Sequence, residues 1–322
     1  MTMRAVQQSG WGAASKVLSV SDAVPLPPSP ASDELGIKVR SVSIHPGDRH
    51  VIKGRPYLVR LVLAGKPWPT IPGMDFAGVV EAVGERAGDR FSVGDEVFGT
   101  TDLSLGAFAE HLVVKEGNVA IKPASVSWEE AASVATSGLT ALQATRTGRP
   151  LEPNDKVLVN GASGGVGCFA VQLAKARGCE VTAVCSAEKA DLVKSLGADV
   201  VVDYRGDVEQ QLSGLSFDKI LDLAGRGGWR PLLKREGDYV AVALPNPKTE
   251  CIPCTLLSVL CCFPTRGRLF KQTVDAGDLE ELARMLDGGE LRAHVGLKLE
   301  GLEQLVVEVM GENGGGKTTV TL

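Results

Sequence analysis

The residues with the clearest chemical potential form a glycine-rich turn, Asn-Gly-Ala-Ser-Gly-Gly-Val-Gly, at positions 160–167. An apolar run at 156–160 predicts a strand before this turn, and residues 165–176 predict a helix after it. In dinucleotide-binding proteins such a turn holds the pyrophosphate, because glycines let the backbone come close and the helix N-terminus offers free N–H groups. A tight turn without a ligand is the alternative. The predicted pyrophosphate-binding residues are Ser163, Gly164, Gly165, Val166 and Gly167.

The end of the next predicted strand indicates which nicotinamide cofactor the turn would accept. Sites for NAD usually carry Asp or Glu about 20 residues past the turn, where the acid binds the ribose 2′-hydroxyl. Here Ser186 stands 19 residues after Gly167, Lys189 follows it, and Tyr204 ends the next strand. A hydroxyl and a cation suit a 2′-phosphate, and an aromatic ring can cover the adenine. The sequence therefore predicts NADP(H); a solvated surface position for Lys189 is the alternative.

The elements that must position these residues change in character near residue 126. Before it, short apolar or alternating runs lie between Gly and Pro signals and predict a compact, mostly β domain. After it, apolar runs alternate with helical patterns, which predicts a doubly wound parallel sheet with helices on both faces. The predicted fold class is α/β. We expect a mostly-β domain at 1–126, a nucleotide-binding domain at 127–265, and a segment at 266–322 that returns to the first domain.

Individual elements follow from the same patterns. The predicted strands are Met3–Gln7, Gly36–Ile44, Phe76–Val83, Glu96–Gly99, Ala107–Val114, Lys156–Asn160, Val181–Cys185, Val200–Val202, Phe217–Leu223, Tyr239–Leu244 and Lys317–Leu322. The predicted helices are Trp128–Arg146, Gly165–Ala176, Glu188–Leu196, Leu279–Leu286 and Leu302–Met310.

Composition excludes several classes of protein. The 322 residues carry 34 Lys and Arg against 39 Asp and Glu, and this net charge of −5 gives a nucleic-acid partner no electrostatic support. Seven cysteines, an odd number, favour a reduced compartment over a disulfide framework. The apolar run Cys251–Phe263 is shorter than the roughly 20 residues that span a membrane. With no cleavable targeting segment visible, we expect an intracellular location, in the cytoplasm or an organelle stroma.

The order of these features resembles the medium-chain dehydrogenase/reductase superfamily, in its zinc-free, zeta-crystallin-like quinone oxidoreductase branch. The motifs that carry the resemblance span most of the chain. They are IPGMDFAGVVEAVG (71–84), FSVGDEVFG (91–99), GAFAEHLVV (106–114), AASVATSGLTALQA (131–144), NGASGGVG (160–167) and SLGADVVVDY (195–204). The resemblance implies a GroES-like domain followed by a Rossmann domain, a small-molecule substrate and NADP(H) as cofactor. A homodimer is a further expectation, with Leu256–Phe263 as a candidate contact.

The resemblance also implies further site residues. Thr140 would lie near the nicotinamide half of the cofactor, and Leu223 and Ala243 would contact the cofactor elsewhere. His50 and Tyr57 would lie at the active-site rim, where either could donate a proton to a carbonyl oxygen; water is the alternative donor. His45 is the third candidate catalytic residue. It opens a His-Pro-Gly-Asp turn at 45–48, where quinone reductases usually have Asn-Pro-x-Asp.

Zinc-dependent members of the superfamily bind catalytic zinc through a Cys near residue 45, a His–Glu pair and a later Cys or His. Here His45 and Gly73-Met74-Asp75 stand at the first two places, and no cysteine precedes Cys168. We therefore expect no metal. Hydride addition to a quinone or an activated C=C needs less Lewis-acid help than alcohol oxidation, so the predicted activity is NADPH-dependent reduction of quinones or α,β-unsaturated carbonyls. The alternative is an NADPH-binding protein without significant turnover, serving as a redox-sensing or structural partner.

Two further motifs are expected to carry no chemistry. Residues 311–318 match the P-loop pattern GxxxxGK[ST], but only four residues follow Thr318, so no helix can form there. Cys251 and Cys254 match a redox CxxC without the strand–helix context of such sites, and we expect them to pack in an apolar segment.

Overall fold

The protein is described by a computed structural model that covers residues 1–225, 228–242, 267–270, 272–310 and 317–322. The chain forms two compact units. Unit 1 comprises Met1–Thr136, Val274–Gly289 and Ala293–Leu322, and unit 2 comprises Ser137–Thr273 and Glu290–Arg292. The C-terminal segment therefore belongs largely to the same unit as the N-terminal part of the chain.

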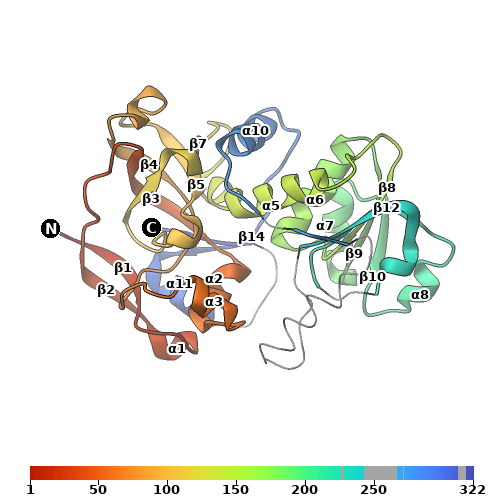
Figure 1. Ribbon diagram of the computed structural model, residues 1–322, viewed down its shortest axis with the longest axis horizontal. Helices are drawn as coiled ribbons and strands as arrows, with labels where there is room; N and C mark the ends of the chain where they lie inside the picture. Colours follow the sequence, from red (N-terminus) through yellow and green to blue (C-terminus); the bar gives the residue numbers. More distant parts are fainter. Residues whose placement is uncertain (226–227, 243–266, 271, 311–316) are drawn as a thin grey trace. The chain divides into compact units, whose positions relative to one another are not determined.

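Unit 1 is organised around a sheet whose central strand is β3 (Glu34–Ile44) (Figure 1). In β3, buried Ile37 and Val39 alternate with exposed Lys38 and Arg40, because successive side chains of a strand point to opposite faces. Within the described residues, the strand order is β14 (Val295–Glu300), β15 (Lys317–Thr321), β3, β4 (Asp75–Val83), β5 (Glu96–Thr100) and β7 (Val119–Ile121), and β6 (His111–Lys115) also pairs with β3. A separate antiparallel pair is formed by β1 (Thr2–Gln8) and β2 (Leu18–Pro25).

Short helices surround this sheet. Phe76, Phe108 and Leu305 are fully buried in one apolar cluster, which packs a C-terminal helix onto the sheet and closes the core of unit 1. The α-helices are α1 (Ala14–Val17), α2 (Pro46–Lys53), α3 (Leu58–Val62), α4 (Trp128–Ala132), α10 (Ala276–Asp287) and α11 (Gly301–Met310). Three 3₁₀ turns are η1 (Ala87–Asp89), η2 (Asp102–Ser104) and η3 (Glu116–Asn118).

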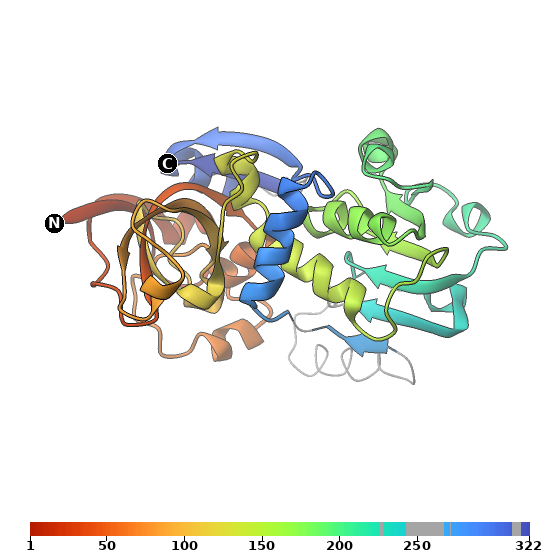
Figure 2. The same cartoon turned by 90° about the horizontal axis from the view of Figure 1, so that it is seen from above.

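Unit 2 contains a parallel sheet, whose strands are drawn as arrows in Figure 2. Its described strands follow the order β10-β9-β8-β11-β12-β13. Their bounds are β8 (Lys156–Asn160), β9 (Glu180–Cys185), β10 (Val200–Asp203), β11 (Phe217–Asp222), β12 (Leu233–Ala241) and β13 (Gly267–Leu269). Val157, Leu158 and Val159 are fully buried, as expected for a parallel strand covered on both faces. The order reverses between β8 and β11, and ligands of such sheets bind outside the carboxyl ends of the strands at this point. The other elements are α5 (Ala135–Arg146, which begins in unit 1), α6 (Gly165–Ala176), η4 (Ala187–Lys189), α7 (Ala190–Ser195), α8 (Val208–Gln211) and η5 (Arg230–Leu232).

The structure confirms a mostly-β part followed by a parallel α/β sheet and corrects several local predictions. The helix predicted over Trp128–Arg146 is two helices, α4 and α5. They separate at Ser133, whose hydroxyl donates to the Glu130 carbonyl and whose N–H is shared between the Glu129 and Glu130 carbonyls. The strand predicted over Ala107–Val114 begins only at His111, because Ala107 N–H bonds outside the ladder, to Gly73 O.

Two more predictions need comment. Glu188–Leu196 starts as the 3₁₀ turn η4 before α7 begins. The end of the strand predicted over Tyr239–Leu244 lies outside the described residues, as do the CxxC pair and most of the P-loop match. Helices α2 and α3 were not predicted. Pro46 at the first position of α2, after a capping residue, favours a helix where the sequence suggested a turn.

Candidate functional site

The predicted nucleotide-binding residues lie at one edge of the unit 2 sheet. Strands β8, β9, β10 and β11 are parallel and in register, so their carboxyl ends meet at this edge. Backbone hydrogen bonds continue past the strand ends: Tyr204 N–H donates to Cys185 O at 3.2 Å, and Leu223 N–H donates to Asn160 O at 3.0 Å. This arrangement brings four predicted cofactor-binding features to the same edge of the sheet: the glycine-rich turn, Ser186, Tyr204 and Leu223.

The glycine-rich turn has the geometry of a phosphate cradle. Gly161 adopts a φ of 82°, in the left-handed region, and its N–H and that of Ala162 both donate to Val184 O at 3.1 Å. A Cβ on Gly167 would lie 2.2 Å from Gly161 O, so only glycine permits this close packing of α6 on the turn. Gly164 caps α6, whose first-turn N–H groups have no partner within the helix. The residues present therefore fit a dinucleotide pyrophosphate.

Lys189 and Ser186 lie beside this cradle. Ser186 is partly buried at the end of β9, whereas Lys189 is exposed in η4. Burial raises the pKa of the Cys168 thiol, in the first turn of α6, to about 12, and the nearby positive charge of Lys189 acts against this rise. Lys189 is carried by the turn that follows β9, at the same edge of the sheet as the glycine-rich turn.

Glu188 and Arg205, which sequence reasoning missed, lie at the same edge. The Arg205 guanidinium donates to the Glu188 carboxylate and lies over the Tyr204 ring, 5.6 Å from its centroid. A hydrogen bond from the Ser186 side chain, followed by the contact with Arg205, lowers the pKa of Glu188. The signal that could have identified Arg205 is a cation directly after Tyr204 in the sequence.

Asp222 organises the loop after β11. Its side chain is 2% exposed and accepts hydrogen bonds from Asn160 Nδ2 at 2.7 Å, Tyr239 Oη at 2.6 Å and Gly225 N at 3.0 Å. These contacts hold the end of β11 next to the glycine-rich turn.

Thr140 is buried in α5 and donates to Gln272 Oε1 at 2.9 Å. Ala243, the remaining predicted cofactor contact, lies outside the described residues.

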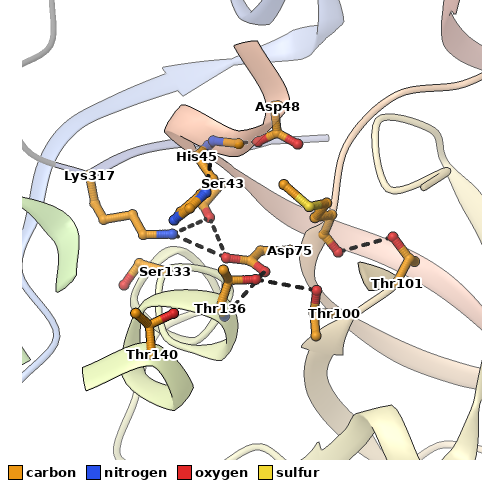
Figure 3. A network of polar contacts seen from close by, with 12 residues as sticks. Ser43, His45, Asp48, Asp75, Thr100, Thr101, Ser133, Thr136, Thr140 and Lys317 are labelled. Carbon is orange, nitrogen blue, oxygen red and sulfur yellow. Dashed lines mark hydrogen bonds and ion pairs between the residues drawn. The ribbon is translucent and has the colours of Figure 1, made fainter. Parts of the chain in front are cut away.

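A buried polar network lies in unit 1 (Figure 3). Lys317 Nζ donates to Ser43 Oγ at 2.9 Å and to Asp75 Oδ2 at 3.1 Å. The other oxygen of Asp75 accepts hydrogen bonds from the backbone N–H and the hydroxyl of Thr136, at the start of α5. Thr136 and Thr100 are in turn joined at 3.3 Å. The Asp75 carboxylate, which stands at the second zinc-ligand place, is therefore engaged by the Lys317 ammonium, the Ser43 and Thr136 hydroxyls and one backbone amide.

His45 caps helix α2. Its Nδ1 accepts from Gly47 N–H at 3.0 Å, and Asp48 Oδ2 accepts from His45 N–H at 2.6 Å, which forms a reciprocal capping box. An accepting Nδ1 places the ring proton on Nε2. Burial, and secondly the positive charge of Lys317, lower the pKa of His45 to about 4, whereas burial raises the pKa of Asp48 to about 7.

The other two candidate catalytic residues lie on the segment that follows the cap. His50, near the end of α2, is exposed, and its Nδ1 lies 3.0 Å from Arg55 O. Since a carbonyl can only accept, His50 Nδ1 carries a proton and donates it to Arg55 O. Tyr57 is partly exposed, and the guanidinium carbons of Arg60 and Arg55 lie 5.0 and 5.8 Å from the centroid of its ring.

No group of three or more His, Cys, Asp and Glu side chains in the described part of the chain is placed to hold a metal ion. Among the helices within the described ranges, none combines the length and apolar character needed to cross a membrane.

A parallel sheet with a glycine-rich turn at its carboxyl edge and a separate β unit in the same chain form the two-unit architecture typical of nucleotide-dependent oxidoreductases. Residues 31–124 match the family model of the alcohol dehydrogenase GroES-like domain, and residues 165–266 match that of the zinc-binding dehydrogenase. The chain belongs to the medium-chain dehydrogenase/reductase superfamily and is a quinone oxidoreductase-like oxidoreductase.

Three relatives illustrate this membership. The chain is 37% identical over 260 residues to a chloroplastic quinone-oxidoreductase homolog of Spinacia oleracea, with 76% of each chain covered. It is 32% identical over 325 residues to a trans-enoyl reductase of Aspergillus terreus, covering 91% of this chain and 88% of that protein. The structure of the quinone oxidoreductase from Coxiella burnetii aligns with a TM-score of 0.82 at 26% identity and covers 100% of both chains. The predicted family and fold class are confirmed.

Proposed function

We propose that the protein is an NADPH-dependent reductase of quinones or α,β-unsaturated carbonyl compounds that works without zinc. The observation that carries this proposal is the joint position of the glycine cradle, Ser186, Lys189 and Tyr204 at one edge of the unit 2 sheet. When bound, NADPH supplies a hydride. Printed descriptions of relatives as quinone-oxidoreductase homolog and trans-enoyl reductase support the two substrate classes.

The chain's own residues would bind and orient the cofactor. The first-turn N–H groups of α6 would hold the pyrophosphate, and the dipole of that helix favours its negative charge. Ser186 and Lys189 would contact the 2′-phosphate, and Tyr204 would cover the adenine. Thr140 would lie by the nicotinamide half of the cofactor, and Leu223 would contact the cofactor elsewhere.

The proton for the reduced oxygen would come from Tyr57, His50 or water. The Tyr57 hydroxyl has a proton to give, whereas the Nδ1 proton of His50 is already engaged by the Arg55 carbonyl. Zinc independence is supported at the second ligand place, where the Asp75 carboxylate is paired with the Lys317 ammonium. The homodimer and the intracellular location stay predictions.

The test is NADPH and NADH oxidation with a panel of quinones and enones, with the dissociation constant of each nucleotide measured separately. We expect turnover with both substrate classes and tighter binding of NADPH. Ser186→Asp is expected to weaken NADPH binding through repulsion of the 2′-phosphate, with Ser186→Ala as the control for loss of the hydroxyl alone. Binding without turnover across a broad panel would favour the alternative role as an NADPH-binding partner. Equal affinity for the two nucleotides would refute the cofactor preference.

A further inference from the structure

An ion pair at the nucleotide edge joins two loops that both face the predicted 2′-phosphate position. Glu188 follows β9 and Arg205 follows β10, and the Glu188 carboxylate accepts from the Arg205 guanidinium. The Ser186 hydroxyl lies two residues before Glu188 and helps to lower the pKa of its carboxyl group, and Arg205 lies over the Tyr204 ring. The Glu188 carboxylate thus holds the guanidinium at this edge, with the Ser186 hydroxyl beside it.

This set of contacts is the one that a phosphate monoester would make. Guanidinium groups bind phosphate and carboxylate oxygens in the same planar geometry, and a serine hydroxyl donates to either anion. The side chains of Glu188 and Arg205 are 64% and 56% exposed. An exposed ion pair contributes little to stability, so a phosphate can displace the carboxylate at small cost.

We propose that the Glu188 carboxylate competes with the cofactor 2′-phosphate for the Arg205 guanidinium. The proposal rests on the proposed function for the identity of the cofactor. When a 2′-phosphorylated nucleotide binds, Arg205 and Ser186 leave the Glu188 carboxylate and bind the phosphate. The released carboxylate then repels the phosphate. With a free 2′-hydroxyl, Glu188 keeps Arg205 and accepts a hydrogen bond from the ribose, as acids do in NAD sites. Glu188 therefore narrows the preference for NADPH and permits NADH to bind.

Position along the chain supports this second role. Glu188 lies 21 residues after Gly167, within the range where an acid binds the ribose in NAD sites. Asp203, the other acid nearby, accepts from Arg205 N–H at 3.0 Å and so is held by its own turn. Lys189 supplies a second cation near the phosphates but has no described contact with Glu188.

The test measures binding and does not depend on turnover. Dissociation constants are determined by calorimetry for NADPH, NADH and the fragments 2′,5′-ADP and 5′-AMP. In Glu188→Gln we expect NADPH and 2′,5′-ADP to bind about three- to tenfold more tightly, and NADH and 5′-AMP about two- to fivefold more weakly, as loss of one charged contact predicts. In Arg205→Ala we expect NADPH to bind about tenfold more weakly with NADH little changed.

A matched control lies at the other end of the same strand. Glu180 begins β9, is exposed and pairs with Lys156 at 3.6 Å. Glu180→Gln removes the same charge from an exposed ion pair and should leave all four constants unchanged. In the Arg205→Ala background, Glu188→Gln should raise the affinity for NADPH by less than it does in the parent protein. Part of the gain in the parent comes from freeing Arg205, which the double variant Glu188→Gln/Arg205→Ala lacks.

Two results would overturn the proposal. One is an unchanged ratio of NADPH to NADH affinity in Glu188→Gln; the other is an equal shift in Glu188→Gln and Glu180→Gln. Either result would leave the proposed function standing, provided that the parent protein binds NADPH. Failure of the parent to bind either nucleotide would refute both. Thermal melts of every variant confirm that the fold is retained.

Discussion

Lys317 Nζ lies 3.1 Å from Asp75 Oδ2, and the two side chains are 3% and 0% exposed although 242 residues separate them in the chain. The pair spans three neighbouring strands, because β15 carries Lys317, β4 carries Asp75, and Ser43 on β3 hydrogen-bonds to both. The last strand of the protein is thus tied to the first half of unit 1 by a buried charge.

Loss of one partner of this pair is expected to destabilise unit 1. Lys317→Met leaves the Asp75 carboxylate buried without its cation, which costs about 3–5 kcal/mol in comparable cases. Calorimetric melting of the variant should show a clearly lowered transition. Lys298→Met is the control, since Lys298 is 59% exposed and lies 4.0 Å from Glu129; its removal should cost at most about 1 kcal/mol. Equal melting temperatures for the parent and Lys317→Met would show that the pair contributes nothing.

The glycines of the cradle are expected to respond differently to alanine. In Gly167→Ala the new Cβ would meet Gly161 O at 2.2 Å, so α6 must shift and the protein should melt at a lower temperature. In Gly164→Ala the nearest atom is Gly161 O at 3.3 Å and φ is −77°, so the fold should persist while nucleotide affinity falls. Thermal melts and NADPH titration separate the two effects. A stable Gly167→Ala variant with parental affinity would contradict this account of the turn.

Local signals explain what the sequence predicted well. The bounds of β8 and α6 are those predicted, because an apolar run, a glycine turn and an amphipathic helix follow one another directly. The N-terminal cap of α2 was not predicted, because histidine is not among the usual capping residues. The pairs Lys317–Asp75 and Glu188–Arg205 depend on which strands are neighbours, and no spacing along one segment reveals that.

Removal of metal is expected to leave the reductase activity unchanged. A zinc ion at Asp75 would have to displace the Lys317 ammonium, and His45 and Asp75 together fall short of a tetrahedral set of ligands. The measurement is elemental analysis of the purified protein, followed by rates before and after dialysis against a chelator. Stoichiometric zinc that leaves together with activity would reverse this expectation.

Asp48→Asn is expected to change how stability depends on pH. In the folded protein the pKa of Asp48 is raised to about 7 from 3.8, so the folded state holds the proton more tightly and stability falls as pH rises through this interval. Among the described residues, Asp48 Oδ1 has no hydrogen-bond partner, which adds to the cost of its charge. His45 acts in the opposite sense, because its pKa is lowered from 6.5 to about 4 and its stabilisation is lost as pH falls through that range.

Since Asp48→Asn leaves His45 in place, the His45 contribution is common to the parent and the variant. The melting temperature of the variant relative to the parent should therefore increase between pH 5 and pH 8, as the parent alone ionises a buried carboxyl. Asp102→Asn, at an exposed turn of the same unit, is the control and should show no such trend. A constant difference between Asp48→Asn and the parent across this range would mean that Asp48 does not titrate there.

Tyr57→Phe is expected to slow reduction of enones more than His50→Ala does. Phenylalanine keeps the ring that contacts Arg55 and Arg60 and removes only the hydroxyl group, whereas the Nδ1 proton of His50 is already donated to Arg55 O. A general acid contributes about 10²–10⁴-fold. We expect kcat/KM for an enone to fall roughly 10²-fold in Tyr57→Phe and by less than about threefold in His50→Ala, since an exposed ring that is not a donor contributes little.

Comparison of substrates separates proton donation from loss of packing. A quinone accepts hydride with less need of a general acid, because water can protonate the hydroquinone oxygen, so Tyr57→Phe should affect the quinone rate much less than the enone rate. NADPH affinity measured on the same variants should stay at the parental value, because Tyr57 lies in unit 1 and outside the nucleotide edge of unit 2. An equal loss on both substrates would indicate a packing role for the Tyr57 hydroxyl. Near-parental rates on both would leave water as the proton donor.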